Sequence, residues 1–180
     1  GLSYESAAPI FCAGYTVMSG LRNADPKPGE RVAIVGLGGL GHLALQFSRA
    51  VGLETWAITG QADKVPELKA MGASDVIVGG KEPGKAMQDA GGFDVVLSTT
   101  NASKQVASAF GGLRPGGRLV NMGVTTDGPI PIDAMTLMMG QRQLRGSSQD
   151  ERSDLVEALE LVAAGKVKPM LEVYPLAKIN

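Results

Sequence analysis

RVAIVGLGGLGHLALQFSRAVG, residues 31–52, decides how this 180-residue chain folds. It opens on a short apolar run, 32–35, which is typical of a buried strand. Gly36, Gly38 and Gly41 then give the pattern G-x-G-x-x-G. The apolar residues that follow recur at helical spacing and share one face: Leu40, Leu43, Ala44, Phe47 and Val51. A strand, a glycine-rich turn and a helix in this order are typical of a dinucleotide-binding element.

Each glycine of this turn has a physical role. Gly36 allows the tight turn out of the strand, Gly38 lets the backbone approach a pyrophosphate, and Gly41 lets the helix pack closely on the strand. Free N–H groups at the start of the helix favour an anion. The alternative is a glycine-rich turn that binds nothing, and the strand-to-helix context favours the ligand. We therefore predict that the backbone of six residues binds the cofactor: Gly36, Leu37, Gly38, Gly39, Leu40 and Gly41.

The composition excludes several classes of protein. A net charge of -1 and an aromatic content of 4% give no sign of a nucleic-acid-binding surface. No run of about 18 apolar residues predicts a membrane span, and the first residues lack the basic and apolar regions of a signal peptide. The single cysteine cannot form an internal disulfide, so we expect a cytoplasmic protein. The length fits one domain.

Strands and helices are expected to alternate along the chain. Predicted strands are 32–35, 55–58, 75–78, 93–97, 118–122 and 143–147, and 170–180 is expected to be extended. Predicted helices are 7–21 with an interruption at Gly14, then 64–71, 82–90, 102–113 and 150–164, with a turn at 114–117. This alternation predicts an α/β fold: a doubly wound, mostly parallel six-stranded sheet of the Rossmann type, with helices on both faces.

Several motifs together carry a resemblance to a known family. They are CAGYT (12–16), a proline-glycine turn before the first strand, GLGGLGH (36–42), LKAMGASDVIV (68–78), LRPGGRLVNMGV (113–124) and PLAKIN (175–180). In order and spacing they resemble the cofactor domain of medium-chain, zinc-dependent alcohol dehydrogenases, in the cinnamyl-alcohol-dehydrogenase-like branch. The resemblance implies the NAD(P)-binding domain of an alcohol/aldehyde oxidoreductase, which positions the nicotinamide for hydride transfer.

The same resemblance implies that the chain is part of a larger enzyme. Residues 1–180 match the dinucleotide-binding domain, and 1–25 and 166–180 would be segments connecting it to a catalytic zinc domain. The Cys and the His-Glu pair of that domain are absent, since the sequence has one Cys and one His. We therefore expect a separated cofactor domain that is inactive alone, in an enzyme acting on a small alcohol or aldehyde.

Cys12 and Thr16 receive roles only from the resemblance. Cys12 matches a ligand of the catalytic zinc, but zinc in catalysis needs about three protein ligands, and one thiolate cannot hold it. By composition alone Cys12 is a small buried apolar residue. Thr16 matches a residue packed against the nicotinamide ring, and otherwise it is a helix threonine that bonds to its own backbone.

The carboxyl ends of the later strands supply further candidates, because ligands of open parallel sheets bind there. By resemblance, Thr99, Thr100 and Asn101 border the adenosine. Gly123 and Val124 border the nicotinamide carboxamide, as do Ser147 and Ser148 after the sixth strand. Each of them could equally be a loop residue without a ligand.

The end of the second strand indicates which cofactor is used. NAD-binding versions place an acidic residue there, which accepts from the ribose 2′-OH. Thr59 or Gly60 stands at that position here, and neither repels a 2′-phosphate. Gln61 can donate a hydrogen bond and Lys64 can supply charge, so we favour NADP over NAD. Asp63 is evidence for NAD instead, because it could lie near the ribose. The loop also has no arginine, the residue that commonly binds a phosphate, and this weakens the case for NADP.

The sequence also allows interpretations of His42, of an apolar cluster and of other functions. His42 is not expected to be a catalytic base, because no nearby carboxylate orients it, and we expect a partly exposed or hydrogen-bonded structural histidine. The apolar cluster Met135, Leu137, Met138 and Met139 is either core or part of a sheet edge near 135–148 that pairs two subunits in a homodimer. The alternative functions are a zinc-free quinone reductase, against which Cys12 argues, and a non-catalytic dinucleotide-binding module.

Overall fold

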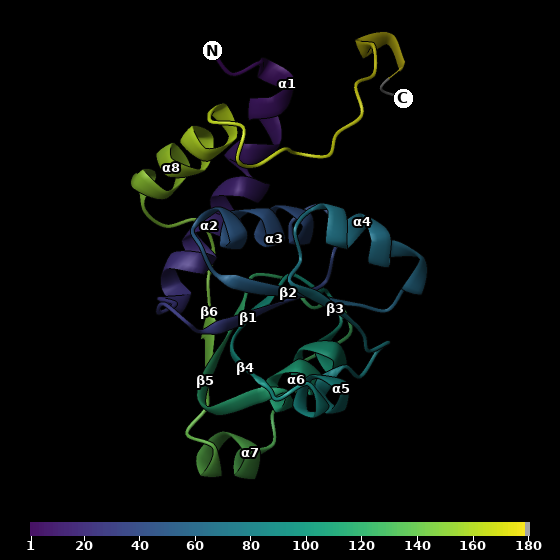
Figure 1. The fold of residues 1–180 in the computed structure, drawn as a ribbon, viewed down its shortest axis with the longest axis vertical. Coiled ribbons are helices and arrows are strands. Elements are labelled where there is room, and N and C mark those ends of the chain that lie inside the picture. Colours follow the sequence, from purple (N-terminus) through teal and green to yellow (C-terminus); the bar gives the residue numbers. More distant parts are fainter. Residues whose placement is uncertain (179–180) are drawn as a thin grey trace.

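The computed structural model describes residues 1–178 and contains one six-stranded sheet (Figure 1). The strands lie in the order β3-β2-β1-β4-β5-β6, and every neighbouring pair is parallel. Their bounds are β1 Arg31–Val35, β2 Glu54–Thr59, β3 Asp75–Val78, β4 Phe93–Ser98, β5 Leu113–Asn121 and β6 Gln143–Gly146. The chain builds outward from β1 to β3, returns to β4 beside β1, and builds outward again. The order therefore reverses between β1 and β4, which is where such sheets bind ligands.

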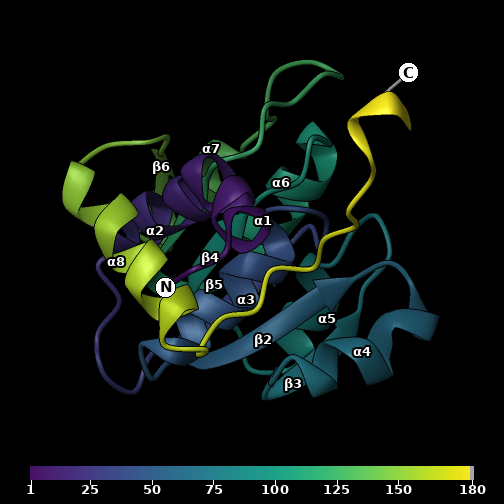
Figure 2. The same ribbon diagram turned by 90° about the horizontal axis from the view of Figure 1, so that it is seen from above.

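Helices cover both faces of the sheet, which confirms the predicted doubly wound fold. Helices α2, α3 and α4 pack on one face, α5 and α6 on the other, and α8 packs outside α2 (Figures 1 and 2). The α-helices are α1 Tyr4–Ala7, α2 Ala13–Ala24, α3 Gly41–Ala50, α4 Val65–Ala70, α5 Gly84–Asp89, α6 Ser103–Gly111, α7 Ala134–Met139 and α8 Arg152–Ala163. Three short 3₁₀ helices are η1 Ala8–Phe11, η2 Ala62–Lys64 and η3 Leu176–Lys178. None of the helices in residues 1–178 is long and apolar enough to cross a membrane.

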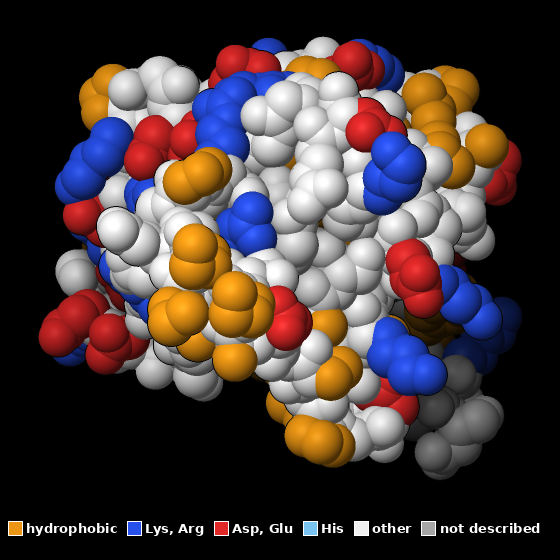
Figure 3. All heavy atoms as spheres, turned by 90° about the horizontal axis from the view of Figure 1, so that it is seen from below, with side chains coloured by type: hydrophobic (Ala, Val, Ile, Leu, Met, Phe, Trp, Pro, Cys, Tyr) orange, Lys and Arg blue, Asp and Glu red, His pale blue; other side chains and the backbone are white. Residues whose placement is uncertain are grey.

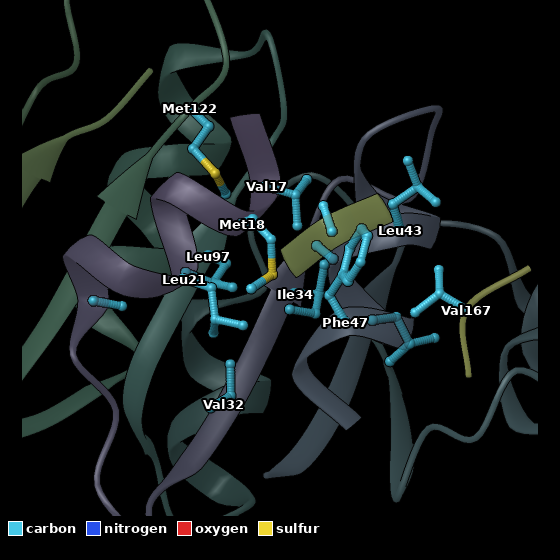
Figure 4. Packing of buried hydrophobic residues seen from close by; sticks show 14 of the residues in the cluster. Val17, Met18, Leu21, Val32, Ile34, Leu43, Phe47, Leu97, Met122 and Val167 are labelled. Atoms are coloured by element: carbon cyan, nitrogen blue, oxygen red, sulfur yellow. The ribbon is translucent and has the colours of Figure 1, made fainter. Parts of the chain in front are cut away.

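Strand β1 is the centre of the core. Its side chains alternate between two buried clusters: Val32 and Ile34 face the α2–α3 side, and Ala33 and Val35 face the α5–α6 side. Figure 4 shows Val32 and Ile34 beneath side chains of α2 and α3. A strand buried on both faces needs an apolar residue at every position, which is why the run 32–35 has no polar member.

The first helix breaks at a different place than predicted. The interruption lies at Cys12, between η1 and α2, and Gly14 lies inside α2. A Cβ on Gly14 would lie 2.8 Å from Cγ2 of Ile10. Gly14 is therefore a site of close packing under a buried isoleucine, and the prediction of a glycine break was wrong.

The predicted turn at 114–117 is part of strand β5. Phe93 pairs with Leu113 and Val95 pairs with Arg118, so the same two pairs are two residues apart on β4 and five residues apart on β5. Gly116 has a φ of 74° within this bulge. The predicted extended segment 170–180 forms no strand in the part that the structure describes, and residues 179–180 lie outside it.

Candidate dinucleotide-binding site

The glycine-rich turn is held against the end of β4. Gly36 has a φ of 87°, and a Cβ there would lie 2.7 Å from the backbone N of Thr100. The hydroxyl of Thr99 donates to the carbonyl of Gly36 at 2.5 Å, and its N–H donates to Val35 at 2.9 Å. These contacts fix the loop at the point where the strand order reverses. The side chain of Thr99 thus acts on the loop itself.

Gly41 brings helix α3 close to the same turn. A Cβ on Gly41 would lie 1.8 Å from the carbonyl oxygen of Gly36, so no other residue fits without a backbone shift. Gly38 and Gly39 differ, because a Cβ on either would have nothing within 4 Å. Both are exposed to solvent at the start of α3. The first and third glycines of the motif thus allow packing, and the middle ones leave the backbone accessible.

The start of α3 offers unused hydrogen-bond donors. Helix α3 has no side-chain cap. Within residues 1–178, the N–H groups of Gly39, Leu40 and Gly41 form no hydrogen bond to a backbone or side-chain acceptor. The helix dipole adds partial positive charge at this end. Gly39 is exposed, Leu40 is half-buried and Gly41 is buried. Unpaired N–H groups at a helix start, beside an exposed glycine backbone, fit the pyrophosphate of a dinucleotide.

A cavity of about 310 Å³ joins this turn to the end of β2. It is lined by Gly36, Leu37, Gly38, Ile58, Thr59, Gly60, Gln61, Lys64 and Gln105. The structure therefore brings the predicted phosphate loop and the predicted ribose-binding residues to one site. Asp63, the residue that argued for NAD, does not line the cavity.

Two residues that line this cavity, Thr59 and Gln105, also form hydrogen bonds within the protein. The hydroxyl oxygen of Thr59 accepts the N–H of Gln61 at 3.1 Å, and only 6% of Thr59 is exposed, so it shapes the loop. Gln105 on α6 was not predicted, and its side chain donates to Gly80 at 3.3 Å. Its one sequence signal is its place in the first turn of the helix that follows β4.

The candidates after β4, β5 and β6 lie along the same edge of the sheet. A Cβ on Gly123 would lie 2.1 Å from the carbonyl oxygen of Thr100, so the two strand ends are in close contact. The N–H of Ser147 donates to Asn121 at 3.1 Å. The exposed members of this group are Asn101, Val124 and Ser148.

Cys12 and Thr16 lie at the start of α2. Cys12 is an exposed free thiol, so the interpretation as a buried apolar residue is wrong. The N–H of Thr16 donates to the carbonyl of Cys12 at 2.9 Å. Residues 1–178 contain no group of three or more His, Cys, Asp or Glu side chains that could hold a metal ion. The residues of this chain do not by themselves fit a catalytic zinc.

His42 is buried and hydrogen-bonded on both ring nitrogens. Nδ1 lies 3.3 Å from the carbonyl oxygen of Gly38, and Nε2 accepts the N–H of Met170 at 3.1 Å. This agrees with the expectation of a structural histidine.

The family assignment comes from comparison with known proteins. The model of a family described as zinc-binding dehydrogenase matches residues 39–164. This chain belongs to the zinc-binding dehydrogenase family. It is 40% identical over 99% of its length to an alcohol dehydrogenase of Geobacillus stearothermophilus, and 32% identical over 99% to an NADP-dependent alcohol dehydrogenase of Mycolicibacterium smegmatis. It covers 53% and 51% of these two proteins.

Solved structures agree with this assignment. A cinnamyl alcohol dehydrogenase from Sorghum bicolor superposes with a TM-score of 0.86 at 29% identity, over 99% of this chain and 50% of that one. The chain thus spans about half the length of its relatives. It corresponds to the NAD(P)-binding domain of the family, and NAD(P) and zinc are the cofactors expected for that family.

Proposed function

We propose that this chain binds NAD(P) for a zinc-dependent alcohol or aldehyde oxidoreductase. The observation that carries the proposal is the exposed backbone of Gly38 and Gly39, with unpaired N–H groups at the start of α3, beside the 310 Å³ cavity. Residues 1–180 form the dinucleotide-binding domain, and 1–25 and 166–180 connect it to the zinc domain of the whole protein.

Each part of the site has its own task. Backbone N–H groups of residues 36–41 bind the pyrophosphate. The adenosine ribose binds at the end of β2, against Thr59, Gly60, Gln61 and Lys64. The adenosine lies beside Thr99, Thr100 and Asn101. Residues near the nicotinamide are Thr16, Gly123, Val124, Ser147 and Ser148. When bound, the nicotinamide supplies or accepts the hydride, and the domain holds it in place. Cys12 contributes one zinc ligand to a site whose other ligands lie outside this chain.

We favour NADP as the cofactor. Lys64 lines the cavity beside the end of β2, and none of the residues that line this cavity is acidic. A 2′-phosphate there meets a cation and no repelling carboxylate. The M. smegmatis relative is named as NADP-dependent, which supports the same choice.

Substitution of Gly38 tests the proposal. Gly38→Asp places a carboxylate where the pyrophosphate binds, and since a Cβ has open space there, the fold stays intact. We expect calorimetric titration with NADP and NAD to show binding to the wild type and none to the variant. Unchanged affinity in the variant would contradict the assignment of the site.

We also propose that two copies pair through the β6 edge. Strand β6 ends the sheet, and apolar side chains beside it are exposed: Met135, Leu137, Met138, Met139 and Leu144. Figure 3 shows hydrophobic side chains gathered on the face seen from below, the side on which α7 lies in Figure 1. This exposure also shows that the interpretation of the cluster as core was wrong.

A further inference from the structure

The segment that follows α8 is tied to helix α3. Residues 166–170, which we call the strap, run along α3 after the chain leaves α8 (Figure 2). Val167 is buried in the same core cluster as Phe47. The strap thus has a fixed place on the helix whose first turn forms the candidate phosphate site.

Two side chains of α3, one helical turn apart, hold the strap in the same way. Gln46 accepts the N–H of Lys168 at 2.9 Å, donates to its carbonyl at 3.1 Å, and donates to the carbonyl of His42 at 3.2 Å. His42 accepts the N–H of Met170 and contacts the carbonyl of Gly38. Each side chain therefore joins a strap amide to the backbone carbonyl four residues before it, which is in α3 for Gln46 and in the glycine-rich turn for His42. The spacing matches, because four helical residues rise about 6 Å and two extended residues about 6.6 Å.

The partners of His42 determine its tautomer. A carbonyl oxygen can only accept, so Nδ1 carries the proton toward Gly38. A backbone N–H can only donate, so Nε2 is unprotonated toward Met170. The imidazole is therefore neutral, with its hydrogen on Nδ1.

The carbonyl that His42 holds belongs to the phosphate loop. It also accepts the backbone N–H of His42 at 3.1 Å. The carbonyl of Gly38 and the N–H of Gly39 share one planar trans peptide and point in opposite directions. A Gly38 carbonyl directed at His42 therefore turns the N–H of Gly39 away from it, and that N–H has no acceptor within residues 1–178.

We propose that His42 is a positioning residue that couples the strap to the phosphate loop. One ring nitrogen fixes the Gly38 peptide, so that the N–H of Gly39 is directed at the dinucleotide, and the other nitrogen fixes Met170. The inference rests on the proposed binding of NAD(P). It gives His42 a role in cofactor affinity without any part in proton transfer.

The contact with Met170 requires an Nε2 that carries no hydrogen. A second cavity, of about 220 Å³, is shared by His42, Met170, Lys64 and Glu67, and Lys168 lies on the strap itself. A proton on Nε2 would face the N–H of Met170, so two donors would oppose each other. It would also place positive charge at the positive end of α3.

Nitrogen NMR of the imidazole is the first test. The chain has a single histidine, so its ring signals need no assignment by mutation. At pH 8 we expect the pattern of a neutral ring with the hydrogen on Nδ1. A ring with its hydrogen on Nε2, or a fast mixture of both tautomers, would overturn the inference, whatever the outcome for the cofactor.

Three variants form the second test: His42→Ala, His42→Gln and Gln46→Ala. Calorimetry with NADPH measures the dissociation constant, and hydrogen exchange measures protection of the Met170 amide. His42→Ala should weaken binding about fivefold, the equivalent of one hydrogen bond, and should expose Met170. His42→Gln should keep the dissociation constant and the protection of the Met170 amide within about twofold of the wild-type values. The reason is that Gln46, one helical turn later, already makes the same pair of contacts.

Gln46→Ala is the matched control. It should loosen the strap at Lys168 and leave the affinity within about twofold, since Gln46 does not touch the phosphate loop. If it weakens binding as much as His42→Ala, or if His42→Ala binds as the wild type does, the coupling is refuted. A wild type that binds neither NADPH nor NADH would contradict the proposed function instead. If His42→Ala does not fold, the inference is still tested by the affinity of His42→Gln and by the tautomer that nitrogen NMR measures in the wild type.

Discussion

At the scale of residues, the proposed choice of cofactor depends on Thr59. It is the last residue of β2, its side chain is nearly buried, and its hydroxyl oxygen accepts the N–H of Gln61. An aspartate can make the same local bond, as Asx turns do, so the loop tolerates the change. A carboxylate at this place would accept from the 2′-OH of NAD and repel the 2′-phosphate of NADP.

We predict that the wild type prefers NADP about tenfold and that Thr59→Asp reverses this preference. Exposed charge contacts are worth about 1 kcal/mol each, and 1.4 kcal/mol is one factor of ten. The measurement is the dissociation constants of both cofactors for both proteins at one ionic strength. A wild type that binds NAD more tightly would show that the interpretation of this loop is wrong, and Asp63 would then be the residue to test.

At the scale of elements, Arg118 joins strand β5 to the end of α2. Its guanidinium donates to the carbonyls of Ala24 and Asp25 and binds Glu30 through two nitrogens, at 3.0 Å and 2.6 Å. The hydrogen bonds from Arg118 hold the pKa of Glu30 below its ordinary value of 4.5, against the opposing effect of burial. The N–H of Lys27 adds a further bond to this carboxylate at 2.6 Å. The connection between α2 and β1 thus depends on an ionised Glu30.

We predict that Glu30→Gln lowers the free energy of unfolding by about 1–2 kcal/mol at pH 7. A depressed pKa stabilises the fold above the ordinary value, and this contribution is lost as the pH falls below about 4.5, through the folded-state pKa. The difference between wild type and variant should therefore shrink toward pH 3. Urea unfolding at pH 7 and pH 3 measures it. The control is Glu160→Gln, an exposed change expected to stay within about 0.5 kcal/mol. A difference that grows on acidification would contradict the account.

At the scale of the whole molecule, the chain is expected to hold no zinc by itself. Cys12 is one ligand, and no metal-binding cluster exists in residues 1–178. We predict no stoichiometric zinc after dialysis and no alcohol oxidation. Elemental analysis of the wild type and of Cys12→Ala should give equal, low values. One zinc retained per wild-type chain would contradict the prediction.

The proposed pairing of two copies is tested on the same scale. Met139 is 72% exposed beside the edge strand, so Met139→Glu should place a charge in the interface. Sedimentation under reducing conditions, which exclude a Cys12 disulfide, should show a dimer for the wild type and a monomer for the variant. The control is Val156→Glu, at an exposed position of α8, and this variant should remain a dimer. A monomeric wild type at about 100 µM would refute the interface.

The sequence determined the local elements of this protein. The run 32–35, the three glycines and the apolar face of α3 predicted β1, the turn and the helix, because burial on both faces and helical spacing leave a local pattern. The alternation of elements predicted the doubly wound sheet, and the ordered motifs indicated the family, which the comparisons confirm.

Only the tertiary structure decided which distant residues meet. The bulge in β5 depends on how this strand pairs with β4, so a local pattern misplaced it as a turn, and the exposure of Met138 decided between two interpretations that the sequence left open. Gln105 joins the cavity because α6 follows a strand next to β1. His42 and Met170 are 128 residues apart, and no spacing in the sequence links them. Hydrophobic periodicity records which face of an element is buried, whereas polar contacts of this kind depend on where the sheet order places each element.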